Sequence, residues 1–288
     1  MRDYVIFTDS GCDLSPDLLA SWGVSYESLV FRFDGEDKEY KNDEMDIQVF
    51  YNKMREGGVA KTAAINKETF ALSFRAILET GKDVLYIGFS SGLSTTHNSA
   101  RLAAIELREE FPDAKILTVD TLAASAGEGL LVYLAKEKKA EGADIEACAA
   151  YVESIRLNMC HWFTVDDLMY LKRGGRVSPT AAFFGNALGI KPVMHVDNEG
   201  HLVNVTKVRG RRTAITAMAE KLGETALDLE NGKIYISHGD CLADAEYLAS
   251  VLEEKFGCTV DLITNVGTVI GAHSGPGTLA LFFLGNER

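Results

Sequence analysis

The spacing of hydrophobic residues in the first half of the chain predicts alternating strands and helices. Short apolar runs alternate there with segments whose apolar residues recur at helical spacing. The pattern predicts strands at 4–8, 25–33, 84–88 and 116–119, and helices at 16–22, 47–55, 67–80, 94–110 and 122–139. Strands separated by helices indicate parallel βαβ units with right-handed crossovers.

The pattern changes after about residue 160. Two strand-like runs, 191–196 and 201–207, flank Asp197-Asn198-Glu199-Gly200, which is a hairpin signal. Helices at 211–229 and 242–256 and strands at 233–237 and 259–264 follow. The predicted fold class is therefore α/β, with a parallel-sheet α/β domain at residues 1–160 and a smaller α+β domain at residues 161–288.

Composition narrows the classes of partner. The 288 residues are 47% hydrophobic and 25% charged, which suits one large or two ordinary globular domains. The formal net charge of −13 argues against binding to nucleic acid or to an anionic membrane surface. Since no apolar run approaches the roughly 20 residues that span a bilayer, stable membrane insertion is not expected.

The cysteines predict neither disulfides nor a metal site. The chain has five, widely scattered and without a C-x-x-C pair, which favours reduced thiols in a cytoplasm. Met1-Arg2-Asp3 leads directly into the strand-like run at 4–7, without the features of a signal peptide. We therefore expect a cytoplasmic protein with no metal.

The segment from Ser90 to Ser99 is rich in hydroxyl side chains at a strand-to-helix junction. In an open parallel sheet such a junction faces the ligand crevice. The helix start supplies free backbone N–H groups, which with the hydroxyls could hold an anionic oxygen. In the alternative interpretation, Ser94 only caps the helix while Ser90 and Ser91 solvate a turn.

Three other polar segments follow or precede predicted elements. Thr8–Asp13 could hold a ligand, but the same residues form Asx and Ser/Thr turns. Thr62 precedes a helix that Asn66 is better placed to cap, so its hydroxyl is free for another role. The small residues from Ala123 to Gly127 favour close helix packing, with a wall for a slender ligand as the second interpretation.

Two basic clusters stand out in this acidic chain. Leu171–Ser178 contains Lys172, Arg173 and Arg176 around a glycine pair, which fits either an anion or acidic-partner site or a helix end. Lys207–Arg212 precedes a helix, where cations are unfavourable, so a carboxylate contact by Arg209 is more credible.

His273 lies among glycines in the last such segment, 267–278. Together with Ser94 it raises the alternative of a nucleophile–base pair in a serine-type acyl hydrolase. However, the chain has no Gly-x-Ser-x-Gly elbow and no evident acid to orient His273. P-loop and dinucleotide-binding motifs are also lacking. The motifs thus give little support to catalysis.

These motifs, in this order, resemble those of the DegV family of bacterial fatty-acid-binding proteins. The resemblance extends over nearly the whole chain, and the joint order and spacing of the motifs make it specific. They are Thr8-Asp9-Ser10 with Cys12-Asp13-Leu14, Ser91-Gly92-Leu93-Ser94, Val119-Asp120, Gly174-Gly175-Arg176, Lys207-Val208-Arg209-Gly210, His238-Gly239-Asp240 and the segment from Ile270 to Gly277.

The resemblance implies two α/β-type domains with a long-chain fatty acid between them. It implies that Ser94 and Thr62 hydrogen-bond the carboxylate, that His273 supports them and that Arg209 lies near the same end. The family presents its fatty acid to a separate ATP-dependent fatty acid kinase, which makes the acyl phosphate used in phospholipid metabolism. By this similarity the chain is a carrier with no cofactor and no nucleotide site, and at most a transient membrane contact.

The chain departs from the family pattern at two places. Ala63-Ala64-Ile65 and Thr95-Thr96-His97-Asn98 stand where the family usually has Ser-Gln-Pro and Gly-Thr-Tyr-Gln. We expect His97 to fill the space of the tyrosine. The expected walls of the acyl tunnel, which ordinary core packing explains equally well, are Phe163, Phe183, Phe184, Leu188 and Ile190.

Overall fold

A four-stranded parallel sheet organises the first half of the chain, in the order β2-β1-β6-β7. We describe the fold from a computed structural model, which covers residues 2–178 and 189–288. Every residue of β6 is buried, as expected for a parallel strand that is covered on both faces. The strands are β1 Tyr4–Asp9, β2 Ser25–Glu27, β6 Asp83–Gly88 and β7 Ile116–Asp120.

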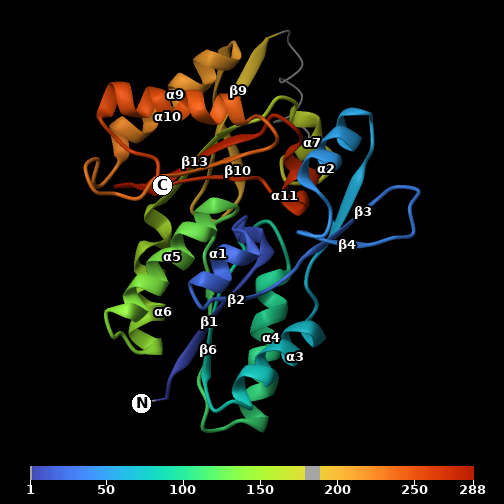
Figure 1. Cartoon of the computed structure of the whole chain (residues 1–288), viewed down its shortest axis with the longest axis vertical. Helices are drawn as coiled ribbons and strands as arrows, with labels where there is room; N and C mark the ends of the chain where they lie inside the picture. The colour runs from blue at the N-terminus through green and yellow to red at the C-terminus, as the bar shows by residue number, and fades with distance from the viewer. Residues whose placement is uncertain (1, 179–188) are drawn as a thin grey trace.

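Helices cover both faces of this sheet (Figure 1). Helices α5 and α6 pack on one face, and α3 and α4 pack on the other. Asn66 caps α3 by accepting a hydrogen bond from the backbone N–H of Thr69, as the sequence predicts. The helices are α1 Pro16–Ser21, α3 Lys67–Leu78, α4 Thr96–Glu110, α5 Ala126–Ala140 and α6 Ile145–Ile155, and η1 Ser10–Cys12 and η2 Arg156–Asn158 are short 3₁₀ turns.

A small antiparallel sheet, in the order β4-β3-β5, extends from the first half towards the second. The single extended segment predicted at 25–33 is wrong, because it divides between β2 and β3, which belong to different sheets. The small sheet and α2 contact α11, which belongs to the second half of the chain. The elements are β3 Val30–Phe33, β4 Tyr40–Lys41, β5 Ala60–Ala63 and α2 Ile47–Arg55.

The second half is built on a six-stranded sheet in the order β10-β9-β8-β13-β11-β12. Neighbouring strands are antiparallel except β11 and β12, which run parallel. The predicted hairpin at 197–200 is present between β9 and β10. The strands are β8 Met159–Thr164, β9 Ile190–Val196, β10 Leu202–Arg209, β11 Tyr235–His238, β12 Leu262–Asn265 and β13 Leu279–Leu284.

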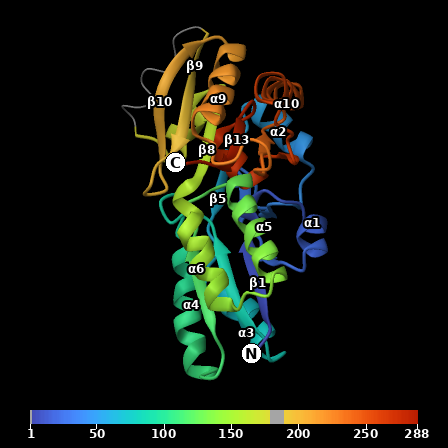
Figure 2. The ribbon, with the colours of Figure 1, turned by 90° about the vertical axis from the view of Figure 1, so that its left-hand side faces the viewer.

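The two faces of the six-stranded sheet have different partners. Helices α9 and α10 cover the outer face, and Figure 2 shows α9 beside β9 and β10 at the end of the molecule opposite α4 and β1. The inner face turns towards the first half of the chain. The helices of this half are α7 Leu168–Arg173, α9 Arg211–Thr225, α10 Leu242–Phe256 and α11 Thr268–Ser274.

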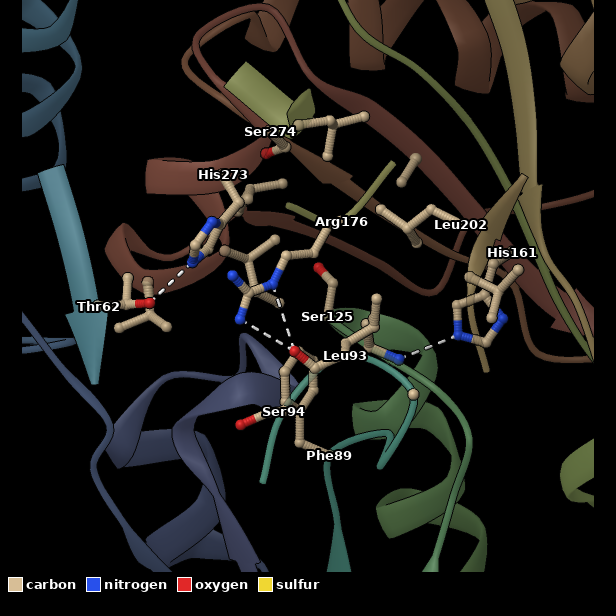
Figure 3. Close-up of a pocket in the computed structure, with 18 of the residues that line it drawn as sticks. Thr62, Phe89, Leu93, Ser94, Ser125, His161, Arg176, Leu202, His273 and Ser274 are labelled. Carbon is tan, nitrogen blue, oxygen red and sulfur yellow. Dashed lines mark hydrogen bonds between the residues drawn. The ribbon is translucent and has the colours of Figure 1, made fainter. Parts of the chain in front are cut away.

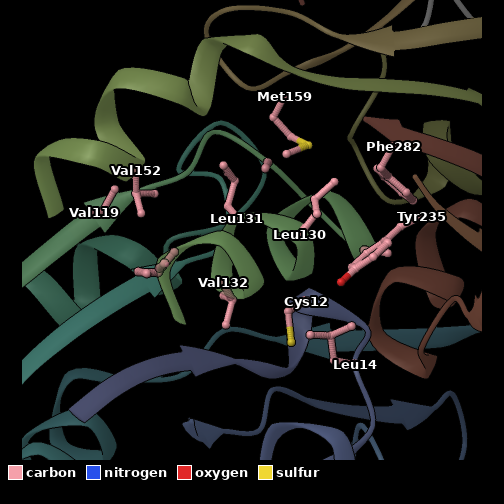
Figure 4. Packing of buried hydrophobic residues seen from close by; sticks show 14 of the residues in the cluster. Cys12, Leu14, Val119, Leu130, Leu131, Val132, Val152, Met159, Tyr235 and Phe282 are labelled. Carbon is pink, nitrogen blue, oxygen red and sulfur yellow. The ribbon is translucent and has the colours of Figure 1, made fainter. Parts of the chain in front are cut away.

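Helix α5 packs between the two large sheets. It contacts β1 and β6 of the parallel sheet and β8, β11 and β13 of the six-stranded sheet. Figure 4 shows its residues Leu130 and Leu131 in one hydrophobic cluster with Cys12, Met159 and Phe282, which come from both halves. The sequence predicts that the small residues from Ala123 to Gly127 allow close packing, and the position of α5 fits this prediction.

These sheets confirm the predicted α/β fold class, but two helix starts were predicted too early. Helix α4 begins at Thr96 rather than Ser94, because Leu93 and Ser94 form a turn on the carbonyl of Ser90. Helix α5 begins at Ala126 rather than Leu122, because Leu122 and Ser125 have positive φ and cannot join a right-handed helix. The domain boundary at residue 160 stays a prediction.

The hairpin between β9 and β10 touches the hydroxyl-rich junction of the first half. The buried Ser90 Oγ donates to the carbonyl of Gly200 (2.9 Å) and accepts from the N–H of Gly92 (3.1 Å). Gly200 has a φ of +80°, and a Cβ there would lie 2.2 Å from Ser90 Oγ. Close approach of the two backbones therefore depends on this glycine.

We predict that Gly200→Ala destabilises the protein more than Gly81→Ala. Gly81 has a similar φ of +84°, but a Cβ there meets no described atom within 4 Å. Both variants incur the cost of positive φ, about 1–2 kcal/mol, and only Gly200→Ala adds a clash. Urea unfolding of the three proteins measures the difference, and equal losses for the two variants would contradict the proposed contact.

Candidate functional site

A cavity of about 490 Å³ lies between the two halves of the chain. Its lining is mostly apolar, and polar side chains gather in parts of it (Figure 3). The apolar residues include Phe89, Leu93, Phe163, Leu202, Ala280 and Phe282. The polar ones include Thr62, Ser94, Ser125, Arg176, Ser237, His273 and Ser274.

Ser94 reaches the cavity from the turn between β6 and α4. Its Oγ accepts from the backbone N–H of Thr96 (3.2 Å) and shares a hydrogen bond with Thr96 Oγ1 (2.8 Å). Ser90 and Thr96 are both fully buried and hydrogen-bonded within the protein. Of these three hydroxyls, Ser94 is therefore the one that lines the cavity.

Thr62 and His273 meet at the cavity from opposite ends of the sequence. Thr62 Oγ1 lies 2.7 Å from His273 Nε2, where β5 packs against α11. The prediction that His273 lies in a glycine-rich loop was wrong, because the residue is part of α11. The helix fixes its ring beside Thr62, as Figure 3 shows.

The His273 imidazole is held in its neutral form. Burial, and secondly the positive charge of Arg176, lower its pKa from 6.5 to about 4. Its Nδ1 has no hydrogen-bond partner among the described residues. A Cβ on Gly174 would lie 2.1 Å from that nitrogen, so the first glycine of the predicted basic loop makes room for the ring.

Arg176 is the cation of the site, a role that the sequence did not single out. Its Nε and Nη2 donate to the carbonyl of Leu93 (3.3 and 3.0 Å), next to Ser94, and its Nη1 donates to the carbonyl of Gly174. Burial lowers the pKa of its guanidinium. Helix α7 ends at Arg173, so the predicted helix end is confirmed, and Arg176 of the same loop lines the cavity. Docking of an anion or an acidic partner at this loop stays a prediction.

Arg209 does not reach the cavity. It is exposed at the far end of β10 and is not among the described residues that line the site. Leu202, at the start of the same strand, does line it. Seven residues of extended chain separate the two, about 23 Å. Arg209 is therefore not among the described lining residues, and its expected place near a carboxylate stays a prediction, whereas Arg176, which follows two glycines, lines the cavity.

The structure describes two of the five residues predicted to form the tunnel walls. Phe163 lines the cavity, whereas Ile190 is not among its described lining residues. Phe183, Phe184 and Leu188 lie outside the described residues. His97 stacks on Tyr86, with ring centroids 6.1 Å apart, which fits its expected role of filling space.

The Thr8–Asp13 segment is chiefly structural. Asp9 accepts from the N–H of Gly11 and from the hydroxyl of Tyr86. Asp13 accepts from Ser125 Oγ (2.5 Å) and from the N–H of Gly267 (3.0 Å), and burial raises its pKa to about 7. Asp13 thus joins the first turn of the chain to the cavity wall and to the segment before α11.

Residues 2–178 and 189–288 contain no group of three or more His, Cys, Asp or Glu side chains that could hold a metal ion. They also contain no helix long and apolar enough to cross a membrane.

Residues 3–286 match a family model described as "uncharacterised protein, DegV family". The chain belongs to the DegV family. A DegV domain-containing protein of Clostridium perfringens is 41% identical, over all of this chain and 99% of its own length. The resemblance of the motifs is thereby confirmed.

Solved structures of DegV-family proteins have the same fold. A fatty-acid-binding DegV-family protein of Thermus thermophilus is 33% identical, with a TM-score of 0.84 over 99% of this chain and 100% of its own. A DegV lipid-binding protein of Thermotoga maritima is 31% identical, with a TM-score of 0.86 over 99% of each chain.

We predict that the His273 ring stays unprotonated until about pH 4. Because the unfolded chain binds this proton near pH 6.5, the residue's contribution to the free energy of unfolding is full above pH 6.5 and is lost as pH falls towards 4. Asp13, with a raised pKa, gives the opposite trend between about pH 4 and 7. The difference in free energy of unfolding between the wild type and His273→Gln should therefore shrink as the pH falls. NMR titration of the ring measures its pKa directly. A difference that is constant from pH 7 to 4 would contradict the assignment.

Proposed function

We propose that this chain binds a long-chain fatty acid in the cavity between its halves, with the carboxylate at Thr62, Ser94, Arg176 and His273. The observation that carries the proposal is an apolar cavity at which Thr62, Ser94, Arg176 and His273 come together from four separate segments, with Arg176 as the one arginine among its described lining residues. Fatty-acid binding by the Thermus thermophilus relative supports the same ligand class.

The hydrocarbon chain supplies most of the binding free energy. Each buried CH₂ group contributes roughly 0.8 kcal/mol, so sixteen carbons contribute about 10 kcal/mol before ordering costs. The aromatic and aliphatic lining, with Phe163 and Phe282 on neighbouring strands β8 and β13, provides the required apolar surface.

The polar end offsets the desolvation of the carboxylate. Hydroxyls of Thr62 and Ser94 donate hydrogen bonds, and Arg176 supplies the opposite charge. The guanidinium is already held by the carbonyls of Leu93 and Gly174, so its position is fixed before a ligand arrives. Because Thr62 donates its proton to the carboxylate, a neutral His273 donates its Nε2–H to Thr62 Oγ1 and adds no second charge.

The family resemblance extends the proposal to a carrier role. The bound acid would be presented to a separate ATP-dependent fatty acid kinase, which forms the acyl phosphate for phospholipid metabolism, while this chain has no nucleotide site of its own. Neutral hydroxyl donors suit this role, because they leave the carboxylate oxygen reactive towards a phosphoryl donor. Arg173, exposed at the end of α7 beside the site, is the residue we assign to docking the kinase.

The alternative of an acyl hydrolase using Ser94 and His273 has less support. A hydrolase needs the serine hydroxyl hydrogen-bonded to the base. Here Ser94 Oγ pairs with Thr96, and His273 Nε2 pairs with Thr62. With Nδ1 also lacking a described partner, the ring has no acid to orient it. The geometry favours a binding protein.

We predict that Ser94→Ala and Arg176→Gln each weaken fatty-acid binding about 10-fold, since each removes a hydrogen bond to a charged group. Displacement of a fluorescent fatty acid from delipidated protein measures the affinity. Ser99→Ala on α4 and Arg209→Gln on β10 are the matched controls, because neither residue is among the described lining residues.

The controls also test whether Arg176 or Arg209 holds the carboxylate. If Arg209→Gln weakens binding and Arg176→Gln does not, the carboxylate end has been assigned to the wrong arginine. If purified protein neither carries lipid nor binds added fatty acid, the proposed function is wrong.

We predict that Arg173→Glu lowers acyl-phosphate formation by a purified fatty acid kinase while leaving fatty-acid affinity unchanged. Charge reversal on an exposed rim residue slows association without altering the cavity. Lys82→Glu, a charge reversal at an exposed lysine before β6, is the control. Equal rates for the wild type and Arg173→Glu would remove Arg173 from the docking surface.

A further inference from the structure

The cavity wall carries hydroxyls beyond those assigned to the carboxylate. Ser125, just before α5, and Ser237, on β11, are 5% and 0% exposed, and both line the cavity. Ser125 Oγ lies 2.5 Å from Asp13 Oδ2 and 2.9 Å from Ser237 Oγ. The hydroxyl pair therefore spans the seam between the two halves of the chain, and Figure 3 shows Ser125 on the cavity wall.

These hydroxyls have hydrogen-bonding capacity that the protein does not use. A serine hydroxyl can donate one hydrogen bond and accept two. Among the described residues, Ser237 Oγ shares a hydrogen bond only with Ser125 Oγ. Ser274, 5% exposed and also lining the cavity, has no hydrogen-bond partner for its Oγ there. A plain hydrocarbon chain would leave this capacity unfilled, which is unfavourable in an apolar site.

Ser237 and Ser274 belong to one wall of the cavity. Gly239, two residues after Ser237, donates to the carbonyl of Thr278 and accepts from the N–H of Gly277, both at 2.7 Å. These bonds hold the segment after Ser274 against the end of β11. Ser237 is also in register with Ala280, an apolar lining residue of β13. Ser237 thus lies beside an apolar part of the cavity lining, whereas Ser274 directly follows His273 on α11.

The backbone at Ser125 supports a role for its side chain. Its φ of 55° and ψ of −147° belong to a region that only glycine adopts without strain. A glycine there would remove the strain, but it would also remove the hydroxyl that links Asp13 to Ser237. Such strain is found where the side chain is needed.

We infer that the preferred ligand is a fatty acid with a hydroxyl group on the part of its chain that passes Ser237. This inference rests on the fatty-acid binding proposed above and names its substrate class. Whichever way the proton between Ser125 and Ser237 points, Ser237 Oγ keeps at least one lone pair free. A hydroxyl on the ligand can therefore always donate to Ser237 Oγ. A keto oxygen has no proton to donate, so it can bond only when the proton of Ser237 is free.

The experiment compares stearic acid with 10- and 12-hydroxystearic acids on the delipidated full chain, by displacement of a fluorescent fatty acid. For the wild type we expect at least one hydroxystearic acid to bind more tightly than stearic acid. Ser237→Ala should weaken binding of that acid about 10-fold. Its affinity for stearic acid should stay within about twofold, because the hydrocarbon contacts are unchanged.

Ser237→Cys, which replaces the hydroxyl with a weakly hydrogen-bonding thiol, gives the same comparison if Ser237→Ala does not fold, and Ser99→Ala on α4 is the control for loss of a serine outside the lining. The inference is wrong if stearic acid binds the wild type at least as tightly as both hydroxy acids. It is also wrong if the serine variants leave the ratio of affinities unchanged. If no fatty acid binds at all, the proposed function is wrong, and the inference that depends on it is wrong as well.

Discussion

The close packing of α5 against two sheets at once is the constraint on which the rest of the structure depends. A Cβ on Gly127 would lie 2.4 Å from His161 Nε2 on β8, and a Cβ on Gly129 would lie 2.8 Å from the carbonyl of Cys12. Gly127 is therefore required for the helix to touch β8, and Gly129 for it to pack on the turn η1 that follows β1, because packed interiors have no space for the extra atoms. The separation of the two sheets, and with it the width of the cavity beside Ser125, follows from this contact.

Charge is distributed so that an acidic chain can keep a site for an anion. Burial raises the pKa of Asp9 and raises that of Glu128 well above its ordinary value, which favours their neutral forms beside α5. Thr8 Oγ1 donates to Glu128 at 3.0 Å, and the Tyr86 hydroxyl donates to Asp9 at 2.6 Å. Asp9 and Glu128 thus add little negative charge near the cavity and do not offset the positive charge of Arg176.

Much of the first half could be predicted from the sequence, because its strands and helices are local patterns. Helix α3 and its cap Asn66 are an example. The six-stranded sheet could not be predicted in this way, because β8 and β13 pair across more than a hundred residues and no short-range signal records that pairing. For the same reason, the contact between Thr62 and His273 came from the family resemblance and not from periodicity.

The arginines show the limit of motif reasoning most clearly. Arg176 and Arg209 both follow or precede glycine in a basic cluster, and the sequence gives no measure of where each strand or loop points. The bulge in β10 between Asn204 and Thr206 and the length of that strand determine that Arg209 ends far from the site. The different positions of the two arginines follow from the path of the backbone and not from the motif around each.

The place of β13 in its sheet has a consequence for the order of folding. The parallel sheet is complete once β7, which ends at Asp120, is available. The six-stranded sheet must wait for β13, because residues 279–284 lie between β8 and β11. Such long-range pairing is slow to form, so during synthesis the apolar face of α5 stays uncovered until almost the whole chain has emerged. The cavity is therefore the last part of the molecule to form, and it exists only once residues 279–284 have paired.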